Sequence, residues 1–199
     1  MQEVVAKHYI DLPYHNFEHA LDVVERTKTL IERCQKYNIQ IDQQAVILSA
    51  LFHDAGYNQN YETAGFDSKE ELSAVLAEQE LNKLGFDSKL IDTVKACIIA
   101  THRNRPFETI EQKVLRAADL AGLAGPYEEF AANSNLLKRE QEYLQARQIT
   151  DDEWKETVRQ LIEFYLSQDI VLTPEHNDED GVSIFHSRAQ TNLDRFLLE

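Results

Sequence analysis

The spacing of apolar residues along the chain predicts helices almost throughout. After Asn16, which can cap a helix, apolar positions recur every three or four residues from 17 to about 37. After Asp42, a second cap, residues 43 to about 55 are apolar on nearly all sides, which is typical of a buried helix. Further helices are predicted at residues 68–84, 88–102, 109–119, 127–147 and 150–165, and a short last one ends at residue 198. We expect an irregular loop at residues 169–185, which hold a proline, a glycine and several acids.

The composition favours one all-α domain. Six glycines and four prolines in 199 residues leave little turn chemistry for a protein of many strands. The chain has no internal repeat, no low-complexity segment and no linker long enough to divide it. We therefore predict a single helical domain over residues 1–199.

The excess of acidic residues excludes several classes of partner. The chain has 20 Lys and Arg against 35 Asp and Glu, which gives a formal net charge of -15. A surface for extended nucleic acid or for an anionic membrane requires clustered basic residues, and the sequence has no such cluster. It also has no membrane-spanning apolar stretch and no signal sequence at its start, so we expect a cytoplasmic protein. Cys34 and Cys97 lie among apolar neighbours and are expected to be reduced packing residues.

Two ionisable residues, His53 and Asp54, close a helical stretch that is otherwise almost wholly apolar. Burying such side chains without partners costs several kcal/mol, so something must satisfy them. A divalent metal ion is one candidate, because imidazole and carboxylate groups are good ligands for such ions. The alternative is that the pair only makes hydrogen bonds at the end of the helix. The dipeptide on its own leaves both interpretations open.

Two further residues extend this pattern. His19 is expected in the first turn of one helix, and Asp119 is a lone carboxylate in the apolar frame of another. With His53 and Asp54 they supply two imidazoles and two carboxylates from three helices. Such mixed ligands suit an ion with open water positions better than a closed structural zinc site. We expect one divalent ion, with Mn, Fe, Co, Ni, Mg and Zn as candidates.

The order of the motifs resembles a known superfamily. Its elements here are Tyr14-His15-Asn16-x-x-His19, Phe52-His53-Asp54-Ala55-Gly56-Tyr57, Glu70-Glu71-Leu72-Ser73-Ala74, Ala100-Thr101-His102 and Ala118-Asp119-Leu120. The pattern resembles the HD superfamily of metal-dependent phosphohydrolases and, more narrowly, a group of small bacterial predicted HD phosphohydrolases. The resemblance covers about residues 9–125 and extends more weakly to the C-terminal helices at 127–199. It implies an all-helical HD-type bundle.

The resemblance also implies roles for individual residues. His19, His53, Asp54 and Asp119 match the metal ligands of the superfamily, and Asp54 is also expected to hydrogen-bond the nucleophilic water. His15 matches the histidine that protonates the leaving oxygen in cyclic-nucleotide phosphodiesterases. Considered without the resemblance, His15 fits a hydrogen-bonding role in the turn before the helix equally well.

Basic residues at the end of the predicted helix 88–102 and beyond it are candidates for contact with phosphate. His102 is expected at a helix end, where the helix dipole favours the cation, and we predict that it contacts the substrate phosphate or the ligand residues. Arg103, Arg105 and Arg116 are candidate phosphate partners as well. The alternative for each arginine is an ordinary solvated side chain.

Two neighbouring glutamates have competing interpretations. Glu70 is a candidate base or hydrogen-bond acceptor for the metal-bound water, whereas Glu71 fits the third position of a capping box. The histidines His8, His176 and His186 lie outside the matching motifs and are expected to be surface or structural residues.

We therefore expect a metal-dependent phosphohydrolase that hydrolyses a small phosphoester by a metal-activated water. It is predicted to be a phosphomonoesterase or a phosphodiesterase acting on a small phosphorylated substrate, with nucleotides among the candidates. A non-catalytic metal- or nucleotide-binding regulatory module is the alternative. The large signalling phosphodiesterases are expected to be poor matches, because they are longer than this chain. The sequence leaves open the substrate, a second ion and the oligomeric state.

Overall fold

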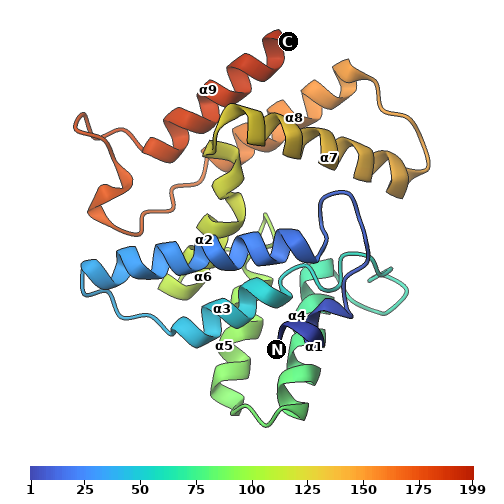
Figure 1. Ribbon diagram of the computed structural model, residues 1–199, viewed down its shortest axis with the longest axis vertical. Helices are drawn as coiled ribbons and strands as arrows, with labels where there is room; N and C mark the ends of the chain where they lie inside the picture. Colours follow the sequence, from blue (N-terminus) through green and yellow to red (C-terminus); the bar gives the residue numbers. More distant parts are fainter. The chain divides into compact units, whose positions relative to one another are not determined.

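The computed structural model describes residues 1–199 and consists of helices without a β-strand (Figure 1). This confirms the predicted all-α class. The helices are α1 (Gln2–Ala6), α2 (Phe17–Lys36), α3 (Gln43–Phe52), α4 (Lys69–Lys83), α5 (Ser88–Ile99), α6 (Ile110–Leu120), α7 (Tyr127–Gln145), α8 (Asp151–Leu166) and α9 (Ile184–Leu198). Two short 3-10 helices are η1 (Ala121–Ala124) and η2 (Pro174–His176).

The predicted capping side chains begin the helices. Asn16 Oδ1 accepts a hydrogen bond from the backbone N–H of His19 at 3.0 Å. Asp42 Oδ1 accepts one from the third residue of α3, also at 3.0 Å. At α8 the predicted capping box is complete, because the side chains of Thr150 and Glu153 each accept from the backbone N–H of the other. Local hydrogen bonding therefore sets where these helices start.

The end of α3 differs from the prediction. The helix ends at Phe52 rather than at about residue 55. The backbone N–H of Ala55 donates to Phe52 O at 3.0 Å, and that of Tyr57 donates to Asp54 O at 2.9 Å. These bonds span three residues instead of four, so the chain leaves the helix in tight turns. As a result, His53 and Asp54 lie just beyond the end of α3.

Two other boundaries also differ. Helix α5 ends at Ile99, before the predicted residue 102, because the backbone N–H of His102 donates to Ile99 O in a three-residue turn at 3.2 Å. Helix α9 begins at Ile184, inside the predicted loop, and its 15 residues make it longer than the short last helix that was predicted. Ser183 caps it by accepting from the backbone N–H of His186 at 3.3 Å.

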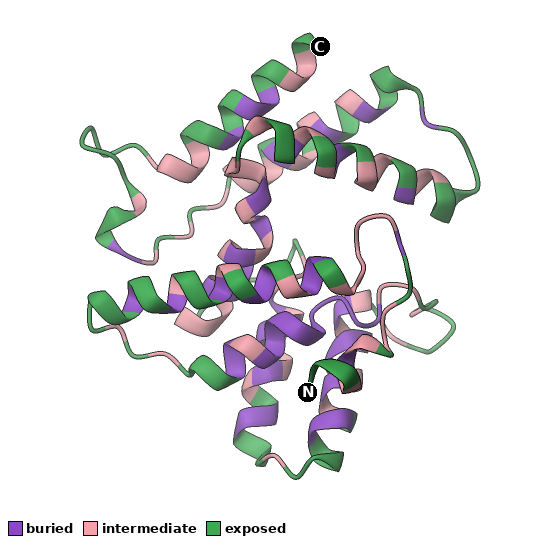
Figure 2. Ribbon diagram, viewed as in Figure 1, coloured by how far each residue is buried: buried purple, intermediate pink, exposed green.

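The chain divides into two compact units, residues 1–119 and residues 120–199. The predicted single domain stays a prediction. In the first unit, α3 packs against α2, α4 and α5. Most of its side chains are buried, as Figure 2 shows. This packing on several sides explains why the sequence of α3 is apolar almost all round.

The second unit has an apolar cluster of its own. Its buried members are Phe130, Ile149, Trp154, Val158, Ile162 and Leu193. Polar side chains beside the cluster have hydrogen-bond partners. Trp154 Nε1 donates to Ser134 Oγ at 2.9 Å, and Asn192 Nδ2 donates to Leu123 O at 2.9 Å. The buried polar atoms of these two side chains therefore need no further ligand.

Two expectations about the whole chain can be compared with the structure. None of the helices has both the length and the apolar character needed to cross a membrane. Cys34 and Cys97 are both buried and form no disulfide. Burial raises the pKa of the Cys97 thiol to about 12, so this side chain stays protonated and packs as a small apolar residue.

Candidate metal centre

Four predicted ligand residues converge beyond the end of α3. His53 and Asp54 follow that helix directly, His19 lies in the first turn of α2, and Asp119 lies near the end of α6. His53 Nε2 is 3.0 Å from Asp54 Oδ2 and 3.6 Å from Asp119 Oδ1. His19 Nε2 is 3.7 Å from Asp54 Oδ2 and 3.5 Å from Asp119 Oδ1. Two imidazole nitrogens thus face two carboxylates, which come from α2, α6 and the turn after α3.

The hydrogen bonding of His53 fits a metal ligand. Its Nδ1 lies 2.8 Å from Ala50 O, and because a carbonyl oxygen only accepts, Nδ1 carries the proton. In the neutral imidazole this leaves a lone pair on Nε2, as a ligand requires. The side chain is 1% exposed, and Nε2 has no hydrogen bond of acceptable geometry, although carboxylate oxygens lie close by. Such a buried, unsatisfied nitrogen is costly unless a cation occupies the position.

The electric field at this position favours a cation. Burial by itself raises the pKa of the Asp54 carboxyl, but the imidazoles of His53 and His15 outweigh burial and hold that pKa below its usual value. Asp119 behaves in the same way, with His19 and His53 holding its pKa well below the usual range. Burial lowers the pKa of His53, yet the two carboxylates raise it well above the usual value. The carboxylates that attract a proton to His53 also attract a metal ion.

The donor set fits a divalent ion. One ligand atom from each of His19, His53 and Asp54 lies within 4.8 Å of the others, and all three residues are buried. Asp119 Oδ1, which lies 3.5 Å from His19 Nε2 and 3.6 Å from His53 Nε2, is a fourth candidate donor beside this group. Two nitrogens and two carboxylate oxygens suit first-row divalent ions and leave room for water or substrate.

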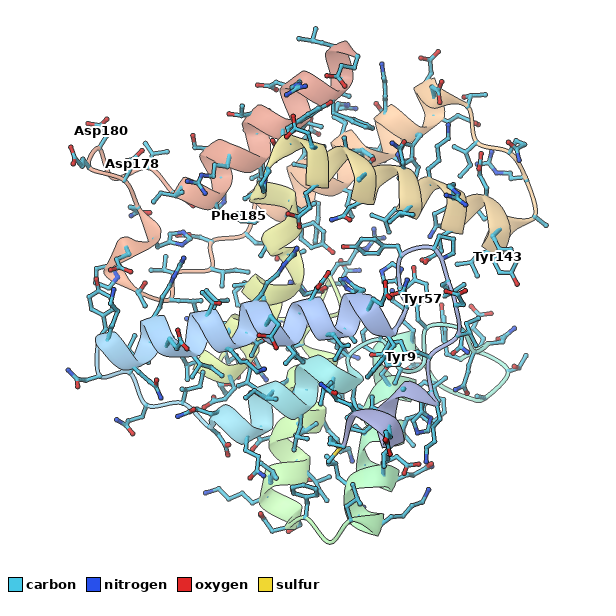
Figure 3. The ribbon with its side chains drawn as sticks, viewed as in Figure 1. Tyr9, Tyr57, Tyr143, Asp178, Asp180 and Phe185 are labelled. Atoms are coloured by element: carbon cyan, nitrogen blue, oxygen red, sulfur yellow. The ribbon has the colours of Figure 1, made fainter.

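Tyr9, labelled in Figure 3, supports the end of α3, a role that was not predicted from the sequence. Its hydroxyl donates to Leu51 O at 2.9 Å and so satisfies a carbonyl in the last turn of the helix. Burial raises the pKa of the phenol well above its usual value, and the charges of Asp54 and Asp119 raise it further. The phenol therefore stays a hydrogen-bond donor. It fixes the turn that carries two of the candidate ligands.

The turn after α3 packs closely against α4 at Gly56. A Cβ at this position would lie 2.9 Å from Leu72 Cγ and 3.0 Å from both Lys69 O and Ser73 N. The backbone N–H of Gly56 donates to Ser73 Oγ at 2.9 Å. The close approach of two backbones is therefore the reason for a glycine at this position.

The two glutamates at the start of α4 have separate environments. Glu70 is 7% exposed and makes no hydrogen bond or ion pair with the rest of the chain. Glu71 Oε2 accepts from the backbone N–H of Asp67 at 3.2 Å, and its other oxygen lies 3.2 Å from Arg105 Nη2. Ser68 Oγ accepts from the backbone N–H of Glu71 at 3.2 Å. Glu71 thus forms part of the hydrogen-bonded cap at the start of α4. No hydrogen bond or ion pair of this kind explains the burial of Glu70.

His15 lies beside the candidate ligands without belonging to them. Its ring stacks on Tyr57 with the centroids 3.7 Å apart and the planes 14° apart. Its ring centroid is 5.8 Å from that of His19. In the turn before α2, Asn16 Nδ2 donates to Leu12 O at 2.9 Å.

The predicted phosphate partners after α5 are placed differently from one another. His102 Nδ1 accepts from the backbone N–H of Asn104 at 3.3 Å, which is a local turn bond. Arg105 is paired with Glu71. Arg116 is 1% exposed and donates to Ala100 O at 3.0 Å and to Thr101 O at 2.6 Å. Arg116 therefore holds the carbonyl end of α5 and does not present its guanidinium to a substrate.

The all-helical fold and the convergence of two imidazoles and two carboxylates fit the class of metal-dependent phosphohydrolases. A family model described as 3'5'-cyclic nucleotide phosphodiesterase matches residues 14–165. The protein therefore belongs to this family, whose enzymes use divalent metals. A solved structure described as LmjPDEB1 in complex with IBMX has a similar fold, with a TM-score of 0.62 and 16% identity over 96% of this chain and 76% of that chain. No curated protein matched the sequence.

The family match confirms the superfamily and the class of hydrolase, and it corrects one expectation. The large signalling phosphodiesterases were expected to be poor matches because of their length, yet the model of the 3'5'-cyclic nucleotide phosphodiesterase family matches residues 14–165.

Proposed function

We propose that this protein hydrolyses the phosphodiester bond of a 3',5'-cyclic nucleotide, with one divalent ion held by His19, His53, Asp54 and Asp119. The observation that carries the proposal is the buried, unsatisfied Nε2 of His53 facing two carboxylates. Membership of the phosphodiesterase family supports the reaction type. A divalent ion bound there would supply Lewis acidity for attack of water on phosphorus.

The surrounding side chains have distinct tasks in this proposal. Asp54 and Asp119 neutralise the ion, and Asp54 also accepts a hydrogen bond from the attacking water. His15 donates a proton to the leaving ribose oxygen from its imidazole, as its place beside His19 allows. Glu70, a buried carboxylate without a partner in the chain, accepts a proton on the water side.

The residues after α5 complete the proposed substrate site. His102 and Arg103 are proposed to contact the substrate phosphate, and Arg105 does so when it leaves Glu71. Within the HD superfamily, we propose that the protein belongs to the small bacterial group, acts as one domain over residues 1–199 and works in the cytoplasm.

The test is metal analysis of the purified protein, followed by assays with that ion and a panel of cyclic nucleotides, linear dinucleotides and phosphomonoesters. We expect about one ion per chain and hydrolysis of a cyclic nucleotide. Asp54→Ala should abolish both, whereas Asp92→Ala, which removes an exposed carboxylate from α5, should change neither.

Three results would contradict the proposal in whole or in part. Unchanged metal content in Asp54→Ala would remove the assigned ligand. A metal-loaded wild-type protein that binds nucleotides but hydrolyses no member of the panel would instead favour the regulatory module. Hydrolysis of phosphomonoesters alone would keep the metal centre and exclude the diesterase.

A further inference from the structure

Three side chains form a stack next to the candidate metal centre. The imidazole of His15 lies on the ring of Tyr57, with centroids 3.7 Å apart and planes 14° apart. The ammonium nitrogen of Lys69 lies 3.6 Å from the centre of the same Tyr57 ring. Figure 3 labels Tyr57 among the side chains of the first unit.

Geometry puts His15 and Lys69 on opposite faces of Tyr57. An atom in the ring plane at 3.6 Å from the centre would overlap the atoms of the ring itself. A nearly parallel imidazole at 3.7 Å already fills one face. The ammonium therefore lies on the other face, where it is attracted by the ring's electrons. Tyr57 is held between an imidazole and a cation.

The parts of the stack are tied to the backbone that carries the candidate ligands. Tyr57 follows Asp54 by three residues, and its N–H donates to Asp54 O at 2.9 Å. Lys69 begins α4, and its carbonyl is one of the atoms that a Cβ on Gly56 would meet at 3.0 Å. Both His15 and Lys69 act electrostatically on the carboxyl of Asp54. The stack thus links the start of α2, the turn after α3 and the start of α4.

We propose that Tyr57 is a positioning residue that orients His15 toward the reacting phosphate, with Lys69 holding the ring from behind. This inference rests on the proposed function, in which His15 protonates the leaving oxygen. An imidazole on a flexible turn has many orientations, and a stacked ring with its other face occupied leaves few. Correct orientation matters in the transition state more than in substrate binding.

The first experiment detects the stacking of His15 on Tyr57 by NMR and does not depend on enzyme activity. Imidazole proton NMR spectra would be recorded for wild type, Tyr57→Phe, Tyr57→Leu and the control Tyr143→Leu, with His15→Gln to assign the His15 signals. Tyr143 is 68% exposed and lies in the second unit. We expect upfield His15 signals in wild type, in Tyr57→Phe and in Tyr143→Leu, because a stacked ring shields them. Tyr57→Leu should move them to ordinary positions, and Lys69→Met should move them part of the way.

The second experiment measures kcat and KM on the cyclic nucleotide that wild type hydrolyses. Tyr57→Leu should lower kcat about tenfold or more and change KM less than about twofold, and Tyr57→Phe should restore kcat. The positioning role is overturned if the His15 signals of Tyr57→Leu stay at the upfield positions of wild type. It is also overturned if Tyr57→Leu leaves kcat unchanged. If wild type hydrolyses nothing, the proposed function fails, while the NMR spectra still decide whether Tyr57 orients His15.

Discussion

His53 in the first unit and His186 in the second differ in how many ring nitrogens form hydrogen bonds within the chain. His186 uses both ring nitrogens within the chain, with Nδ1 2.7 Å from Ser183 Oγ and Nε2 3.0 Å from Leu166 O. His53 uses only Nδ1 and leaves a buried Nε2 facing carboxylates. A histidine with both nitrogens bonded holds the fold together. One with a single bonded nitrogen has a position left for a ligand.

The largest effect is expected for metal binding when His53 is substituted. His53→Gln should weaken Mn²⁺ binding by more than about 100-fold, because one of the four protein donors is lost. The same change at the other histidine, His186→Gln, should leave Mn²⁺ affinity unchanged and lower the free energy of unfolding by about 1–3 kcal/mol. Titration against a competing chelator and urea unfolding measure the two quantities. Equal metal affinity in both variants would contradict the distinction.

A second pair of variants compares the backbone packing of the units. Gly56→Ala should cost about 1–3 kcal/mol of unfolding free energy, because the added methyl meets the backbone of α4. Gly125→Ala is the control, since its nearest neighbours would lie at 3.4 Å and its φ of -72° suits alanine. Urea unfolding should show little change for this control. If Gly56→Ala has the same free energy of unfolding as wild type, the turn and α4 are not packed as described.

Tyr9→Phe tests the support of the turn. The substitution removes the hydrogen bond to Leu51 O and should weaken Mn²⁺ binding about tenfold, since ligands without support lose their orientation. Tyr143→Phe removes an exposed hydroxyl from the other unit and should have no effect. Identical Mn²⁺ affinities for wild type and Tyr9→Phe would show that the turn does not depend on Tyr9.

The smallest effect concerns Glu80, a buried carboxylate of α4 that has the partners Glu70 lacks. Its Oε1 lies 3.0 Å from Lys83 Nζ and 3.1 Å from Lys7 Nζ. The hydrogen bond from Lys83 outweighs burial, and with Lys7 it lowers the pKa of Glu80 to about 2. A depressed pKa stabilises the fold above the unfolded value near 4.5, and this stabilisation is lost as the pH falls toward 2.

The matching measurement is unfolding of wild type and Glu80→Gln at a series of pH values. Both lysines are more than half exposed, so the difference should be only about 1 kcal/mol at neutral pH. It should vanish between pH 4.5 and 2. A difference that grows on acidification would have the wrong sign for this account.

The sequence predicted the helices and the four converging residues well, because capping and apolar spacing are local properties. Asn16 and Asp42 cap the expected helices, and the ligand candidates stood out as polar residues in apolar frames. The roles of Tyr9 and Arg116 could not be predicted, because each depends on which carbonyl the fold brings near its side chain. The turn after α3 likewise depends on packing against α4, since Gly56 has no room for a side chain there.

The central claim, a divalent ion between His53 and its facing carboxylates, is tested most directly by anomalous diffraction from a crystal soaked in Mn²⁺. We predict one strong anomalous peak in contact with Nε2 of His19 and His53 and with oxygens of Asp54 and Asp119. The absence of a peak at this position, or a peak only elsewhere on the protein, would contradict the account.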